Sequence, residues 1–137
     1  QRQMCIRDSY IVISRLGYDW ANDKHMLVLR IFDSGLNNLS DITLINYDDT
    51  LCDYWVRIFN GYIYAYVCTG SNIALYKYAP DGSLIATLPC LCPIMDNNGN
   101  IYCWDDTNGF SKYDSNFNLI KSMSPPPAIP CTPIMFL

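Results

Sequence analysis

The chain has 137 residues, of which 50% are hydrophobic and 16% charged, with a net charge of −4. This length allows one domain or part of a larger one, and the apolar content is too high for a disordered chain. The nine cations are scattered singly, so a basic surface for nucleic acid or an anionic membrane is excluded. All 13 acidic residues are Asp, and turn formers alternate with Ile, Val and Tyr, which predicts an all-β fold.

The first nine residues differ from the remainder of the chain. They hold both Gln residues and two of the nine cations, and they lack strand alternation and the apolar stretch of a signal peptide. The segment resembles a translated sequencing adapter of the kind found at the ends of metagenomic assemblies. We therefore predict that residues 1–9 are a non-native leader, and the fold prediction leaves them out.

Residues 10–54 form the first and least regular of several expected strand groups. Met26 to Phe32 and Ile42 to Ile45 have the composition of outer strands. A second strand around Tyr18 to Trp20 is poorly marked. Apolar runs here and elsewhere are about one strand long, far short of the roughly 20 residues of a membrane-spanning helix, so no membrane insertion is expected.

Two further groups, residues 55–92 and 93–130, each predict four short antiparallel strands. The first group places them at 55–59, 62–68, 73–78 and 84–88, and the second at 93–96, 101–105, 110–113 and 119–123. The Asn-Gly pair within Asn97 to Asn100 predicts a two-residue hairpin. Pro125 to Pro127 is a stiff linker, and residues 131–137 are expected to open a truncated fourth group.

These groups are copies of one another. Asn60-Gly-Tyr-Ile-Tyr-Ala-Tyr66 matches Asn98-Gly-Asn-Ile-Tyr-Cys-Trp104 after 38 residues, and Lys77-Tyr78 matches Lys112-Tyr113 after 35. The Pro-Ile-Met triplet at Pro93 recurs after 40 residues. A single four-stranded sheet cannot hide both of its faces, so repeated sheets of this kind must stack on one another.

The segment Asp96-Asn-Asn-Gly-Asn-Ile-Tyr102, followed by Lys112-Tyr113-Asp114, resembles the NHL-like and related β-propeller families. In those families "D-G-N-I-Y-V" and "K-Y-D-x-x-G-x-L" recur in each blade. Phe117 stands where the pattern has Gly, whereas Asp81-Gly82 keeps it. The resemblance implies a partial propeller with blades at 10–54, 55–92 and 93–130. Propellers typically have 4 to 8 blades, so we expect a fragment that self-associates when made alone.

The cysteines allow three interpretations. Cys90 or Cys92 and Cys131 each precede the first strand of a group, which permits a disulfide between neighbouring groups, with Cys90 and Cys131 as the candidate pair. A Cys-x-Cys metal corner at Cys90 and Cys92 lacks the spacing and the partner pair that zinc prefers, and His25 is the only histidine. Small buried thiols are the favoured interpretation, and no metal is expected.

The remaining titratable residues do not form a catalytic pattern. Asp96, Asp105, Asp106 and Asp114 fall in one group, but they lack calcium-loop spacing and the chain has no Glu. Turn formation explains them. No nucleophile motif accompanies His25, so we expect no catalytic residue and no cofactor.

Aromatic residues are the strongest binding signal. Tyr62, Tyr64 and Tyr66 alternate along one strand and share a face, and packing between sheets is their favoured role. Trp55 and Trp104 are the candidate ligand-binding residues, because Trp combines a large contact area with a polar N–H.

These features predict a non-catalytic binding or scaffold module that recognises a protein or carbohydrate ligand through blade loops. The alternative is a fragment of a propeller hydrolase or lyase whose catalytic residues lie in missing blades. Few Lys, no Glu, abundant Asn and Tyr, and six cysteines beyond the leader favour the cell exterior or envelope. Free thiols would suit the cytoplasm.

Overall fold

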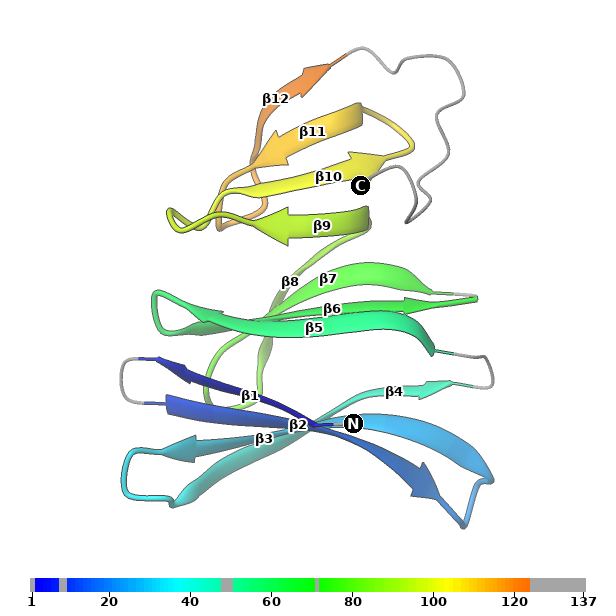
Figure 1. The fold of residues 1–137 in the computed structure, drawn as a ribbon, viewed down its shortest axis with the longest axis vertical. Coiled ribbons are helices and arrows are strands. Elements are labelled where there is room, and N and C mark those ends of the chain that lie inside the picture. The colour runs from blue at the N-terminus through cyan, green and yellow to red at the C-terminus, as the bar shows by residue number, and fades with distance from the viewer. Residues whose placement is uncertain (1, 8–9, 48–50, 71, 124–137) are drawn as a thin grey trace.

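The computed structural model describes residues 2–7, 10–47, 51–70 and 72–123, which form three four-stranded antiparallel sheets. These are sheet 1 (β1–β4), sheet 2 (β5–β8) and sheet 3 (β9–β12), and in each the strands lie side by side in chain order. Figure 1 shows the sheets stacked along the long axis of the molecule. The all-β prediction is confirmed.

The strands of sheets 2 and 3 overlap the predicted ones, but two begin before the predicted start of their group. Strand β5 begins four residues early, at Leu51, and β9 two residues early, at Leu91. Sheet 2 consists of β5 Leu51–Phe59, β6 Tyr62–Thr69, β7 Ile73–Tyr78 and β8 Leu84–Leu88. Sheet 3 consists of β9 Leu91–Met95, β10 Ile101–Asp105, β11 Gly109–Tyr113 and β12 Leu119–Met123. The described residues contain no helix, and hence none that is long and apolar enough to span a membrane.

Sheet 1 differs from the other two in the length of its strands. It consists of β1 Arg2–Arg7, β2 Tyr10–Asp19, β3 Lys24–Asp33 and β4 Asn38–Tyr47. The poorly marked second strand is the end of the ten-residue β2. Within the segment that the sequence analysis left out, β1 pairs with β2 from Arg2–Arg15 to Arg7–Tyr10. The adapter origin of that segment stays a prediction.

Hairpin turns of several lengths connect the strands, and two of them test the sequence predictions. Asn60 and Gly61 both have positive φ and form a two-residue turn, because Phe59 pairs directly with Tyr62. The two-residue hairpin predicted at the second Asn-Gly pair is wrong. Met95 pairs with Ile101, so five residues form that turn, and its first residue, Asp96, closes it by hydrogen bonding to backbone N–H groups.

The same five-residue turn closes four hairpins, at residues 33–37, 79–83, 96–100 and 114–118. In each, the first residue donates its N–H to the fifth carbonyl, and the fourth donates its N–H to the first carbonyl. The fourth residue has positive φ, and the four are Leu36, Gly82, Gly99 and Phe117. Glycine adopts this backbone freely and other residues adopt it at a cost, so Leu36 and Phe117 stand out.

The core consists of side chains between the sheets. Between sheets 1 and 2 it is almost wholly aliphatic, and its buried members include Val12, Leu29, Ile31, Ile42, Val56 and Ile58. Between sheets 2 and 3 it holds larger and more polarisable side chains, including Tyr64, Tyr66, Leu75, Cys90, Cys103 and Tyr113. Alternation along each strand gives sheet 2 one apolar face toward each neighbour.

Candidate ligand-binding surfaces

Trp55 lies on β5 and joins sheet 2 to sheet 3. Its indole Nε1 donates to the Pro93 carbonyl at 3.0 Å, and its ring centroid lies 6.1 Å from that of Tyr66. Trp55 also lines a shallow groove of about 300 Å³ together with Pro93 and Ile94. Because a contact within the chain occupies the N–H, only the ring of Trp55 is available to a ligand.

Trp104 lies on β10 beside a second hollow, of about 350 Å³. Its residues come from the end of the stack where β7 and β9 begin: Ile73, Pro89, Cys90, Leu91, Trp104, Asp105, Asp106 and Thr107. Trp104 is half-buried, whereas Asp106 and Thr107 are exposed at the β10–β11 turn. An aromatic ring, a carboxylate and a hydroxyl thus lie within one small concave surface.

The carboxylate of Asp105, at the inner side of this hollow, makes its hydrogen bonds within the chain. It accepts hydrogen bonds from the backbone N–H groups of Thr107 and Asn108, from the Asn108 side chain and from the Tyr113 hydroxyl. Burial raises the pKa of Asp105, but these donors outweigh that effect, so its pKa is lowered. Burial, with Asp105 nearby, raises the pKa of Tyr113 to about 12. The exposed Asp106 is therefore the carboxylate available to a ligand here.

The other aspartates of this group serve turns, as the sequence analysis expected. Asp96 and Asp114 each accept two backbone N–H groups of their own five-residue turn. Backbone hydrogen bonding from Asn118 is the main reason why the pKa of Asp114 is lowered. Among the residues whose side chains the structure describes, no three His, Cys or Asp side chains come together as metal ligands. His25 has its backbone in β3, paired with Tyr18 and Tyr47.

The cysteines correct one prediction. Cys90 is buried and its thiol is free, so the candidate disulfide between Cys90 and Cys131, which the sequence analysis held as the less favoured interpretation, is not formed. The disulfide-bonded cysteine is Cys92, which is exposed and has a positive φ. Regular alternation would place Cys90 and Cys92 on the same face, because they are two residues apart. The register of β9 against β10 shifts at this point and Cys92 has a positive φ, so a bulge separates the two side chains. The neighbouring Cys103 thiol, together with burial, raises the pKa of Cys90, which makes it a poor nucleophile.

Cys131 and the expected opening strand at residues 131–137 lie outside the described residues, as does the Pro125 to Pro127 linker. Cys68 and Cys103 are free thiols as well. Burial is the main cause that raises the pKa of Cys68. Free, buried thiols at Cys90 and Cys103 agree with the interpretation of small buried side chains between sheets.

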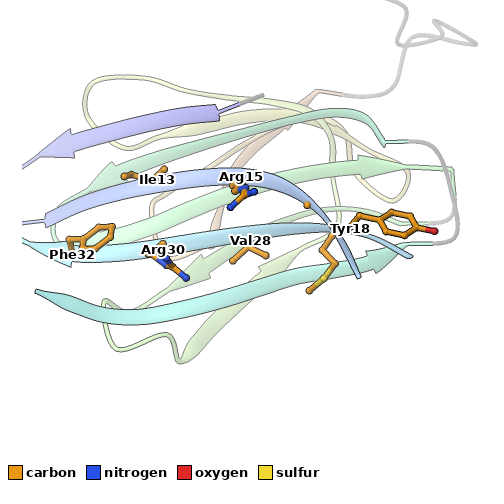
Figure 2. A pocket seen from close by; sticks show the side chains of 8 residues that line it. Ile13, Arg15, Tyr18, Val28, Arg30 and Phe32 are labelled. Carbon is orange, nitrogen blue, oxygen red and sulfur yellow. The ribbon is translucent and has the colours of Figure 1, made fainter. Parts of the chain in front are cut away.

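A third hollow, of about 480 Å³, lies on the outer face of sheet 1. Figure 2 shows its side chains along β2 and β3, with Ile13 and Arg15 on one strand and Val28, Arg30 and Phe32 on the other. The Arg30 guanidinium makes two hydrogen bonds to the Asp41 carboxylate, both at 3.0 Å. The sequence analysis missed this surface, because the strands of sheet 1 were the least clearly marked.

The sequence analysis also missed the role of Lys77. It is buried between sheets 2 and 3, and its Nζ lies 4.3 Å from the Tyr62 ring centroid. The Nζ also donates to the Ser115 carbonyl and to Asn116 Oδ1, at 3.2 and 2.8 Å. Burial lowers the pKa of Lys77. The three alternating tyrosines on β6 were the available signal, since they build an aromatic wall for a cation.

Comparisons with protein-family models, with curated proteins and with solved structures give no match.

Proposed function

We propose that this chain is a non-catalytic binding module built from propeller-type blades, with its ligand contacts at the loop end near Trp104. Three features support the propeller-type arrangement. Consecutive antiparallel sheets of four strands stack face to face, the last strand of one sheet leads directly to the first strand of the next, and the first strands β1 and β5 lie in contact. Radial stacking of four-stranded sheets is the propeller design.

The hollow at Trp104 carries the functional proposal. It joins an accessible indole to the exposed Asp106 and Thr107, whereas the neighbouring Asp105 is used internally. An aromatic ring with a few convergent hydrogen-bonding groups is the usual composition of a recognition site. A ring that stacks on a sugar face and a carboxylate that accepts sugar hydroxyls favour a carbohydrate ligand.

A glycan array, followed by calorimetric titration of each hit, tests this proposal. We expect Trp104→Ala to weaken binding by about 2 kcal/mol or more, as for an aromatic hot spot, and Asp106→Asn to weaken it less. Trp20→Ala is the matched control, because Trp20 is 86% exposed on the β2–β3 turn and lies outside the hollow. Equal losses for Trp20 and Trp104, or turnover of a bound glycan, would contradict the proposal.

A further inference from the structure

The three sheets share one pattern of cross-strand pairs, which assigns their faces. An Ile on the second strand pairs with an aromatic residue on the third, directly before a five-residue turn. The pairs are Ile11–Phe32, Ile63–Tyr78 and Ile101–Tyr113. In sheets 2 and 3 this pair lies on the face toward the preceding sheet, here called the leading face. The opposite face is the trailing face.

Within the part of the chain that the structure describes, two of these faces have no sheet packed against them. The outer face of sheet 1, with Phe32 and the hollow of Figure 2, is by this correspondence a leading face. The outer face of sheet 3 is a trailing face and carries the exposed side chains of Ile94 and Phe110. An open leading face and an open trailing face on one molecule suit a second copy of the same chain.

The closed joint between sheets 2 and 3 shows what a trailing face binds. Lys77 on β7 reaches the turn 114–118 of sheet 3 and bonds to Ser115 and Asn116. Tyr64 on β6 donates its hydroxyl to the Ser115 carbonyl, and its ring lies edge-on to Phe117 with centroids 6.0 Å apart. The main contacts are therefore a cation and an aromatic ring against the turn that closes the next sheet.

The charges on the two sides of this joint match. Lys77 interacts electrostatically with Asp114, the first residue of that turn. In the joint between sheets 1 and 2, the position of Lys77 is taken by the buried Ile31 and that of Asp114 by Ala79. In the joint between sheets 2 and 3, a lysine on the trailing face therefore faces an aspartate on the turn of the next sheet. In the joint between sheets 1 and 2, both of these positions hold apolar residues.

The two outer faces carry the charged combination found between sheets 2 and 3, a lysine on the trailing face and an aspartate at the start of the turn. Lys112 lies on the trailing face of sheet 3, with its Nζ 5.6 Å from the Tyr102 ring centroid, the separation that Lys77 has from Tyr64. On sheet 1, Asp33 opens the turn 33–37.

The apolar part of the joint is present as well. Leu36 stands in that turn where Phe117 stands in sheet 3, with a positive φ and 70% exposure. A leucine held in the left-handed region and left open to solvent is suited to contact a partner. The hydroxyl of Tyr102 already bonds to Asp96, so its ring is the part left to pack.

We propose that copies of this chain associate head to tail, with the trailing face of sheet 3 against the leading face of sheet 1 in the next copy. Lys112 of one copy then meets Asp33 of the next, and Tyr102 packs against Leu36. Such a joint uses two different surfaces and produces a ring or an open series. The proposal goes beyond ligand binding, and none of these four side chains lines the Trp104 hollow. Trp104 nevertheless shares the trailing face with Tyr102, because the two alternate along β10, so the joint and a ligand at Trp104 would compete.

Charge reversal combined with mixing tests the joint. Sedimentation velocity over a concentration series measures association of the wild-type chain, of Lys112→Asp and of Asp33→Lys. Each single reversal sets like charges against each other, so we expect its dissociation constant to rise by about tenfold or more. An equimolar mixture of the two variants restores an attractive pair at every joint, and its association is expected to return to within about threefold of wild type.

Asp23→Lys is the matched control, because Asp23 lies exposed in the β2–β3 turn, at the other end of β3 from Asp33, and it should leave association unchanged. Recovery in the mixture also shows that both variants fold. A wild-type chain that stays monomeric up to about 0.1 mM, or association that neither reversal weakens, would overturn the proposal. So would equal weakening by Asp23→Lys or a mixture that does not recover.

Discussion

The joint between sheets 1 and 2 and the joint between sheets 2 and 3 solve the same packing problem with different chemistry. The first relies on aliphatic side chains such as Leu29 and Ile58, with one side-chain hydrogen bond from Ser40 to the Pro80 carbonyl. The second adds tyrosines, thiols and a buried lysine, with directional bonds from Trp55 and Lys77. Apolar burial supplies most of the stability in both, whereas hydrogen bonds fix the position of sheet 3.

The largest effect is expected from a cavity in the aliphatic joint. Leu29 is fully buried, so Leu29→Ala should lower the free energy of unfolding by about 2–5 kcal/mol. Leu84→Ala is the control, because Leu84 is 53% exposed on β8. Urea unfolding measures both variants. Equal losses for the two would show that this joint is not the core.

A substitution at the contact of Gly99 with Phe59 should come next. Gly99 has a φ of +82°, and a Cβ there would lie 2.3 Å from Phe59 Cε2. Backbone strain and overpacking together make Gly99→Ala cost about 2–4 kcal/mol. Gly61→Ala separates the two causes, because Gly61 also has positive φ but no atom within 4 Å of its Cβ position, and it should lose only the strain.

Lys77→Met sharpens the contrast between the joints. Methionine keeps the apolar stem but removes the bonds to Ser115 and Asn116, which we expect to cost about 1–3 kcal/mol. Lys121→Met is the control on the exposed β12 and should change stability by less than about 0.5 kcal/mol. A Lys77→Met variant as stable as wild type would mean that the charge adds nothing to the second joint.

High pH should weaken both joints, and the second more than the first. The second joint buries Tyr64, Tyr66 and Tyr113, whereas the first buries Tyr78, whose pKa burial raises to about 12. Burial raises the pKa of Tyr64 to about 12, and burial with Asp105 raises that of Tyr113 to about 12. A raised folded pKa gives stability that is complete below the unfolded value near 10 and is lost as pH rises through about 12. Tyr64→Phe should reduce this loss, measured as urea midpoints against pH. An unchanged pH profile in that variant would contradict the assignment.

The smallest effect is expected at a polar contact of the first joint, the hydrogen bond from Ser40. Ser40→Ala removes the hydrogen bond to the Pro80 carbonyl, for an expected cost of about 1 kcal/mol. Ser83→Ala is the control, because its hydroxyl bonds only within its own turn. If Ser40→Ala costs more than Lys77→Met, the two joints do not differ as described.

Local patterns predicted much of sheets 2 and 3. Alternating tyrosines marked β6, and the Asn60-Gly61 pair marked its hairpin, because both signals depend only on neighbouring residues. The second Asn-Gly pair misled, since Asp96 closes a longer turn through its carboxylate. The pairing of β1 with β2 had no signal in a segment that resembles an adapter.

The candidate sites depend on long-range contacts, so the sequence predicted them less well. Trp55 and Trp104 were chosen by residue type, and only their neighbours in space separate the joining role of Trp55 from the accessible position of Trp104. The different states of Cys90 and Cys92 depend on the irregular pairing of β9 with β10, which the sequence does not mark. Lys77 resembles an exposed lysine in the sequence, and its burial follows from the position of the next sheet.

The central claim is that three sheets stack through repeated faces. Nuclear Overhauser spectroscopy on aromatic and methyl protons tests it most directly. We predict cross-peaks between the Tyr64 and Phe117 rings and between Leu29 and Ile58 methyl groups, since these residues lie in the two joints. A spectrum that shows the cross-strand contacts within each sheet but no contact between sheets would contradict the account.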